Sequence, residues 1–167
     1  MEVLTDVVAT QPRVVFCGMA GAESPRLREH YYETPGNAFW ELLHESGIVP
    51  TRLGPDQDRE VAGFGLGLTD LVAHHAVDPP SYEIDELVDR IARWQPEWLA
   101  FTSKTVAAVV ARHLGVRRPG LGPTGWDLAG ASVFVLPGSS GANRRRDYDG
   151  RPDRLSWWRD LAGLAGF

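Results

Sequence analysis

The chain of 167 residues contains a single cysteine, Cys17, and this scarcity sets the first limits on its chemistry. One thiol excludes an internal disulfide and any iron–sulfur or zinc site built from several cysteines. The His, Asp and Glu residues do not show the spacing of a recognised zinc or calcium site either. We therefore expect no bound metal and no cofactor. Because Cys17 lies in an apolar run, we interpret it as a buried packing residue.

Long hydrophobic runs are also missing. The longest apolar stretches are strand-sized, so the sequence predicts no membrane span. The first fifteen residues include Glu2 and Asp6 rather than a basic, apolar, cleavable leader, and we expect a cytoplasmic protein without a membrane partner. The length and the 43% hydrophobic content predict a single domain over residues 1–167, and nothing requires more than a monomer.

An excess of positive charge is missing as well. The sequence has 17 Lys and Arg residues against 22 Asp and Glu residues, a net charge of −5, which argues against a protein that holds nucleic acid by its overall charge. Positive charge is concentrated locally, with five arginines between residues 144 and 154. Two interpretations stay open: a basic lip that contacts nucleic acid, or a solvated arginine-rich loop.

The apolar pattern predicts an α/β fold with a mostly parallel central sheet that helices cover on its two faces. Residues 65–72 are interpreted either as a short strand or as a buried turn. The other expected strands are residues 13–17, 98–101 and 133–136, and the expected helices are 39–46, 84–94, 104–114 and 153–164.

Two segments, 14–21 and 136–144, each combine an apolar strand with a polar loop that contains glycine. In a parallel sheet the carboxyl ends of such strands lie at one edge, where small residues let backbone N–H groups approach a ligand. The connection that follows the first strand is long and irregular, which is typical of a loop that covers a pocket. These features predict a ligand site at this edge.

The first segment reads Gly18-Met19-Ala20-Gly21-Ala22, and residues 31–40 and 67–72 follow it in order. Together with residues 94–96, 101–104 and 138–144, this order resembles the mismatch-specific uracil/thymine DNA glycosylase family of the uracil-DNA glycosylase superfamily. The resemblance implies a three-layer α/β/α sandwich. It also implies a metal-free enzyme that flips a damaged base out of DNA and hydrolyses its glycosidic bond.

The resemblance also assigns roles to individual residues. Tyr32 corresponds to an aromatic that stacks on the flipped base, although packing of its own loop is the alternative. The wedge that fills the gap in the duplex corresponds to Ala142, and an alanine makes a poor wedge. The implied base-binding residues are Gly18, Met19, Ala20, Tyr32, Gly138, Ser139 and Ser140, and the implied DNA-binding residues are Ala142, Asn143, Arg144, Arg145 and Arg146.

Ala20 stands where the family usually has the asparagine that positions the attacking water, and alanine cannot orient water. Asp70 is the natural substitute, because an ionised carboxylate can orient water and stabilise the oxocarbenium ion. The alternative for Asp70 is a cap on the following turn. Glu23 is the second candidate carboxylate.

Four other polar residues carry weaker signals. Lys104 is expected either to contact a phosphate or to begin a solvated helix face, and Asn37 is expected to cap a helix and brace its loop. His74 and His75 are candidates for assisting the leaving group, but exposed histidines more often have no such role.

The sequence thus predicts a monofunctional glycosylase that removes uracil, with other deaminated bases as further candidates, from DNA in base excision repair. Asp70 is its expected catalytic residue. The alternative is a catalytically altered relative that acts as a nucleobase-binding or lesion-binding module.

Overall fold

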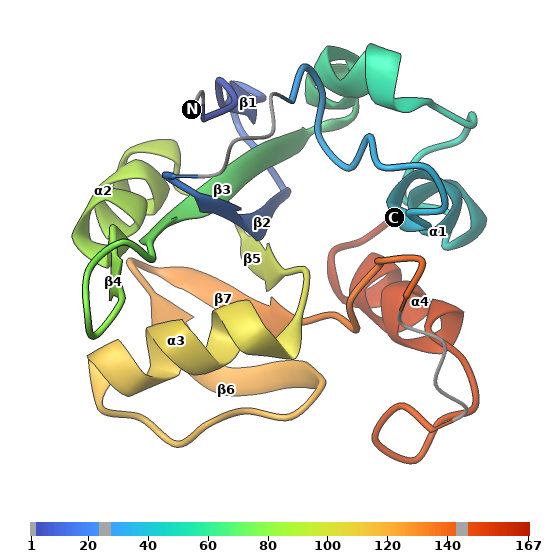
Figure 1. The fold of residues 1–167 in the computed structure, drawn as a ribbon. Helices are drawn as coiled ribbons and strands as arrows, with labels where there is room; N and C mark the ends of the chain where they lie inside the picture. The colour runs from blue at the N-terminus through green and yellow to red at the C-terminus, as the bar shows by residue number, and fades with distance from the viewer. Residues whose placement is uncertain (1–2, 24–27, 143–146) are drawn as a thin grey trace.

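A seven-stranded sheet forms the centre of the computed structural model, which describes residues 3–23, 28–142 and 147–167 (Figure 1). The strands are ordered β1-β3-β2-β5-β7-β6, and β4 pairs with β3. The four central strands are parallel, whereas β1, β4 and β6 pair antiparallel with their neighbours. Their bounds are β1 Val7–Val8, β2 Val14–Gly21, β3 Leu66–His74, β4 Ser81–Tyr82, β5 Trp98–Phe101, β6 Gly122–Leu128 and β7 Ala131–Val135.

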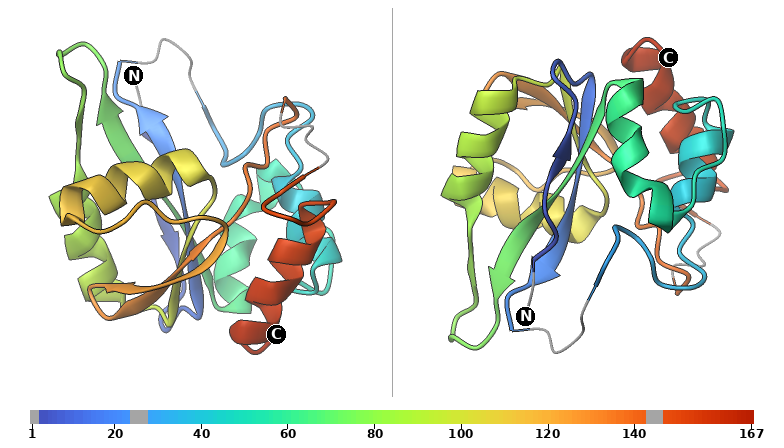
Figure 2. Two further views of the ribbon diagram at one scale, coloured as in Figure 1. Left: turned by 90° about the horizontal axis from the view of Figure 1, so that it is seen from below. Right: turned by 90° about the horizontal axis from the view of Figure 1, so that it is seen from above.

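Helices cover the sheet on its two faces (Figures 1 and 2). Helices α2 (Ile84–Trp94) and α3 (Lys104–Leu114) pack on one face, and α1 (Phe39–Glu45), the 3-10 segment η1 (Pro55–Phe64) and α4 (Leu155–Leu164) pack on the other. The predicted three-layer α/β fold with a mostly parallel sheet is confirmed. Within the described ranges, no helix is long and apolar enough to cross a membrane.

The apolar run of β2 is continuous rather than alternating because the strand lies between two hydrophobic cores. Val14 and Phe16 point into the core beneath α1 and α4, whereas Val15 and Cys17 point into the core beneath α2 and α3. A central parallel strand is buried on its two faces, so every position favours an apolar side chain. Cys17 is fully buried, as predicted, and burial raises the pKa of its thiol far above the ordinary value.

Residues 18–21 and 66–74 are among the segments that differ from the sequence expectation. Strand β2, expected to end at residue 17, continues to Gly21, because its backbone pairs in parallel with β3 as far as Ala73. The segment 18–21, expected to be a loop, is therefore strand. Residues 66–74 form a full nine-residue strand, which settles the choice between strand and turn.

Strand β6 was not expected from the sequence. Gly122, Pro123 and Gly125 lower the strand signal, but this is an edge strand that pairs with β7 through the tight turn at Ala129 and Gly130. The two turn residues have φ values of 49° and 89°, as a two-residue hairpin turn requires.

Candidate functional site

A cavity of about 280 Å³ lies where β5 has ended while β2 and β3 continue. Phe101, the last residue of β5, pairs with Cys17, so Thr102 and Ser103 leave the sheet beside Gly18. The residues that line the cavity are Gly18, Met19, Arg28, Tyr32, Glu33, Thr34, Asp70, Thr102, Ser103, Thr105 and Val106. The structure thus brings together Gly18, Met19, Tyr32 and Asp70 of the predicted site.

Gly18 is the point on which three polar side chains converge. A Cβ atom on Gly18 would lie 3.0 Å from Asp70 Oδ1, 3.1 Å from the Tyr32 hydroxyl and 3.3 Å from Thr102 Oγ1. Contacts of 3.0–3.4 Å are tighter than nine in ten real Cβ contacts, so these neighbours would have to move by a few tenths of an ångström. Glycine is therefore favoured here by space rather than by backbone conformation, since Gly18 has no left-handed φ.

Asp70 lies inside strand β3, directly opposite Gly18 in the parallel register. This position excludes the alternative that it caps a following turn. Its side chain is only 4% exposed, and its Oδ2 accepts a hydrogen bond from Arg28 Nη2 at 3.0 Å. Burial raises the pKa of the Asp70 carboxyl above its ordinary value, and the neighbouring Arg28 guanidinium opposes that shift.

The backbone of Asp70 is also fixed. Arg90 Nη2 donates to the Asp70 carbonyl oxygen at 2.8 Å. The preceding residue, Thr69, donates its hydroxyl to Asp6 Oδ1 at 2.6 Å. The carboxylate is therefore presented from a rigid strand rather than from a mobile loop.

Tyr32 is held in an unusual conformation at the cavity wall. Its φ of 53° lies in the left-handed region, which a bulky residue rarely adopts. The ring stacks on Phe39 with centroids 3.9 Å apart and planes 13° apart, and its hydroxyl donates to Thr102 Oγ1 at 3.2 Å. Burial raises the pKa of the Tyr32 hydroxyl well above 10, so this group stays neutral. Strain maintained by such contacts is common at functional sites.

The second predicted loop, residues 138–142, does not line this cavity. Ser139 is buried and its carbonyl accepts from Ala38 N at 2.8 Å, whereas Ser140 Oγ accepts from Ala142 N at 3.2 Å. Arg154 Nη1 donates to the carbonyl oxygens of Gly138 and Ser140, at 3.0 and 3.1 Å. The loop is thus braced from within the protein.

Gly138 instead lines a neighbouring cavity of about 410 Å³, which shares Ser103 and Thr105 with the Asp70 cavity. Lys104 lies in this second cavity, where its Nζ pairs with Asp149 Oδ1 at 2.5 Å. The DNA-binding residues expected at 143–146 lie outside the described residues.

Ala20 and Glu23 lie away from the Asp70 cavity. Ala20 is 4% exposed and pairs with Val72 within the sheet. Glu23 is exposed, and its carboxylate accepts from His75 N at 3.0 Å and lies 3.6 Å from His74 Nδ1. His74 Nε2 in turn contacts Glu83 Oε2 at 2.6 Å.

Asn37 lies one residue before Ala38, the N-cap of α1, and its Oδ1 accepts a hydrogen bond from Phe39 N at 3.0 Å. No group of three or more His, Cys, Asp or Glu residues in the described part of the chain is placed to hold a metal ion.

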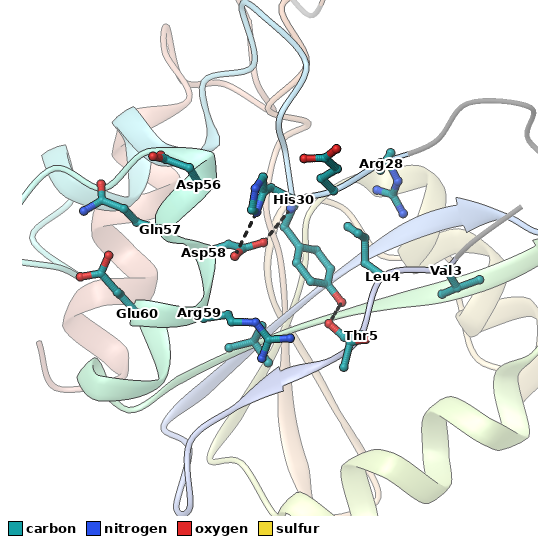
Figure 3. Close-up of a pocket in the computed structure, with 13 residues that line it drawn as sticks. Val3, Leu4, Thr5, Arg28, His30, Asp56, Gln57, Asp58, Arg59 and Glu60 are labelled. Atoms are coloured by element: carbon teal, nitrogen blue, oxygen red, sulfur yellow. Dashed lines mark hydrogen bonds and ion pairs between the residues drawn. The ribbon is translucent and has the colours of Figure 1, made fainter.

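A further cavity, of about 540 Å³, lies between residues 28–31, η1 and the N-terminal residues 3–7 (Figure 3). Asp58 of η1 anchors this segment, because its Oδ2 accepts from Tyr31 N at 3.1 Å and its Oδ1 lies 3.4 Å from His30 Nδ1. Arg28 lines this cavity as well as the Asp70 cavity.

Arg28 and Thr102 are residues of the site that the sequence did not single out. Arg28 lies 42 positions before its partner Asp70, a contact that no local pattern reveals. Thr102 had a usable signal, because it immediately follows a predicted parallel strand and such positions commonly face the ligand.

The comparison with known families agrees with this arrangement. The sequence model of the Uracil DNA glycosylase superfamily matches residues 5–162, a range that includes every described residue lining the Asp70 cavity. Because this match covers nearly the whole sequence, the chain belongs to the uracil DNA glycosylase superfamily.

Proposed function

We propose that the protein is a monofunctional DNA glycosylase that excises uracil from DNA in base excision repair, with Asp70 as the catalytic residue. The observation that carries the proposal is the buried carboxylate of Asp70 in a cavity that Gly18 and Tyr32 also line, within a chain of this superfamily. The cavity, of about 280 Å³, lies near the lower end of the range of ligand pockets, and a small ligand such as one nucleobase is compatible with that size.

The proposed reaction is hydrolysis of the bond between the sugar carbon C1′ and the base nitrogen N1. As this bond breaks, its electron pair leaves with uracil and positive charge develops on the deoxyribose. The Asp70 carboxylate stabilises that charge and orients a water molecule, whose oxygen forms the new bond to C1′. The water proton passes to Asp70 and then to solvent, while the uracil anion takes up a proton, so the products are an abasic site and uracil.

Tyr32 and the end of β2 are proposed to hold the flipped base. One face of the Tyr32 ring is covered by Phe39, and the residue borders the cavity. Stacking of a base on an aromatic ring contributes about 1–3 kcal/mol. Gly18 and Met19 are proposed to approach the base through their backbone, since Gly18 leaves space for close contact.

The duplex is proposed to lie across the loop 138–142 and the residues that follow it. Within the loop, Gly138, Ser139 and Ser140 remain proposed contacts for the base or its flanking phosphates. Ala142 and Asn143 to Arg146 remain the proposed wedge and phosphate-contacting segment. Arg154 supports this surface, because its hydrogen bonds to the carbonyl oxygens of Gly138 and Ser140 hold the loop in place.

A second candidate function follows from Ala20. By the family resemblance, Ala20 stands where an asparagine is usual, and Ala20 pairs within the sheet and does not line the cavity. A chain that has lost water activation at this position is also consistent with a module that binds a lesion without cutting. Asp70 favours the enzyme, because an ionised carboxylate beside the sugar of a flipped nucleotide can orient water and stabilise the oxocarbenium ion.

The test uses labelled oligonucleotides that contain uracil opposite guanine, uracil opposite adenine, uracil in a single strand, hypoxanthine or xanthine. We expect alkali-sensitive abasic sites in at least one uracil substrate under enzyme excess at low salt. DNA binding is followed in parallel by fluorescence anisotropy. Preferential binding of uracil-containing DNA without any cleavage would reject the glycosylase and support the binding module.

A further inference from the structure

Arg28 is the cationic side chain among the described residues that line the Asp70 cavity. Its Nη2 lies 3.0 Å from Asp70 Oδ2, and its side chain is 25% exposed, against 4% for Asp70. The pair is therefore largely removed from water but open toward the cavity. A charge-assisted hydrogen bond of this kind is stronger and more directional than a neutral one.

The segment that carries Arg28 is fixed from the other side. Asp58 binds His30 and the backbone of Tyr31, as Figure 3 shows for His30 and Asp58. The Tyr31 hydroxyl donates a hydrogen bond to the Thr5 carbonyl oxygen at 3.1 Å. The backbone carbonyl oxygen of Tyr31 accepts one from Trp40 Nε1 at 3.1 Å. Arg28 is therefore presented to Asp70 by an anchored segment.

The two carboxylate oxygens of Asp70 have different surroundings. Oδ2 is occupied by Arg28, whereas Oδ1 lies beside Gly18, where the absence of a side chain leaves room. Rotation of the carboxylate would break the contact with Arg28. The ion pair thus fixes the plane of the carboxylate, with one oxygen on Arg28 and the other beside Gly18, which also lines the cavity.

The same contact affects the charge of Asp70. Burial favours the neutral carboxylic acid, which can neither accept a proton from water nor stabilise a cation on the sugar. The positive charge of Arg28 is the largest of the effects that lower the pKa of Asp70 against this burial. Arg90 also lowers it, but Arg90 donates to the backbone carbonyl rather than to the carboxylate.

We propose that Arg28 is a positioning residue for the excision reaction, which holds the Asp70 carboxylate charged and directs Oδ1 toward the substrate. The inference rests on the proposed function of Asp70. It extends that function to a residue that the family resemblance leaves without a role.

The test compares Arg28→Gln and Arg28→Lys with the wild type in single-turnover excision of uracil as a function of pH. Arg28→Gln is expected to slow excision by about tenfold or more and to move the acid limb of the profile to higher pH. Arg28→Lys keeps the positive charge. Its excision rate and the pH of its acid limb should therefore lie between those of Arg28→Gln and the wild type. Arg112→Gln is the control, because it removes an exposed positive charge in the last turn of α3, outside the Asp70 cavity, and should leave the acid limb in place.

A second measurement does not depend on activity. The carboxyl carbon of Asp70 is titrated by ¹³C NMR in the wild type and in Arg28→Gln, with Asp70→Asn used to assign the signal. We expect the pKa of Asp70 to rise when Arg28 is replaced. DNA affinity is measured on the same proteins.

The outcomes separate the two proposals. If the wild type excises uracil but Arg28→Gln keeps the wild-type rate and acid limb, the positioning role is wrong and the glycosylase stands. If Arg28→Gln only weakens DNA binding, with the acid limb and the Asp70 pKa unchanged, Arg28 is a phosphate contact and the inference is overturned. If folded wild type excises nothing, the proposed function fails, and the inference that rests on it fails too, whatever the NMR titration gives.

Discussion

At the scale of single residues, the site depends on small distances around Gly18. Asp70 Oδ1, the Tyr32 hydroxyl and Thr102 Oγ1 all lie within 3.3 Å of the place that a side chain at residue 18 would occupy. Asp70, Tyr32 and Thr102, which follows β5, therefore pack closely around Gly18. Any added atom must displace at least one of them.

Gly18→Ala is expected to reduce uracil excision by roughly tenfold or more, because the new methyl group displaces the Asp70 carboxylate from its working position. Single-turnover kinetics on a uracil-containing duplex measure the effect.

The control for this variant is Gly163→Ala in α4, where an added Cβ meets nothing within 4 Å. It should leave excision unchanged and raise the free energy of unfolding by about 0.5–1 kcal/mol, because alanine loses less backbone entropy in a helix than glycine. Equal excision rates for Gly18→Ala and the wild type would show that the close packing around Gly18 has no catalytic importance.

At the scale of elements, two tethers fix the chain that covers the site. One is the contact of Asp58 in η1 with residues 30 and 31, and the other joins the end of β2 to the β3–β4 hairpin through Glu23, His74 and Glu83. The first tether is buried and the second is exposed. They are therefore expected to respond differently to substitution and to pH.

Asp58→Ala is expected to lower the free energy of unfolding by about 1–3 kcal/mol, because Tyr31 N loses its buried acceptor. Asp58→Asn keeps an oxygen acceptor and should cost less than Asp58→Ala. Urea denaturation of the three proteins measures the difference. Equal stability of Asp58→Ala and the wild type would show that the segment is held by its aromatic packing alone.

The second tether predicts a pH dependence. The contact with Glu83 is the main cause that raises the pKa of His74 above its ordinary value of 6.5. A group with a raised folded-state pKa contributes stability that is fully present below the unfolded pKa and is lost as pH rises through the folded value. The stability difference between the wild type and Glu83→Gln should therefore shrink as pH increases from about 6 to about 9. A difference that stays constant or grows over this range would contradict the role of His74.

At the scale of the whole molecule, two cores on the two faces of the sheet support the site, and α4 closes one of them. Trp158 of α4 is fully buried and stacks on Phe16 of β2, with ring centroids 5.6 Å apart. Phe39, on which the Tyr32 ring stacks, contacts the same Trp158 edge-on, with ring centroids 5.4 Å apart. The last helix therefore supports the cavity wall through Phe39.

Trp158→Ala is expected to lower the free energy of unfolding by about 3–5 kcal/mol, through loss of buried area and creation of a cavity. Trp158→Phe should cost less, because Trp158 Nε1 has no hydrogen-bond partner among the described residues and its loss leaves no acceptor unpaired. Thermal and urea unfolding compare the variants. A Trp158→Phe protein as unstable as Trp158→Ala would mean that Nε1 makes an important contact.

The sequence predicted the fold where one periodic pattern dominated. Helices α2 and α3 have the expected bounds because their buried residues recur at helical spacing, and strand β5 has them because its four residues form one apolar run. Strand β6 was missed, since its glycines and proline lower the local signal while pairing with β7 decides its structure.

Some residues of the candidate site could be predicted from the sequence, and others could not. Gly18, Tyr32 and Asp70 could be named from the family resemblance, and the structure brings them to one cavity. The part played by Arg28 depends on tertiary structure, because its contact with Asp70 joins segments 42 residues apart. The loop 138–142 borders the adjacent cavity through Gly138, so its contact with the base or the flanking phosphates stays a prediction.

The most direct test of the account is the rate of uracil release by Asp70→Asn under single-turnover conditions, with Glu23→Gln as the control carboxylate and circular dichroism as the check on folding. The account predicts that Asp70→Asn folds and releases uracil at least about 100-fold more slowly than the wild type, whereas Glu23→Gln keeps the wild-type rate. Release of uracil by Asp70→Asn at the wild-type rate would contradict the assignment of Asp70 as the catalytic residue.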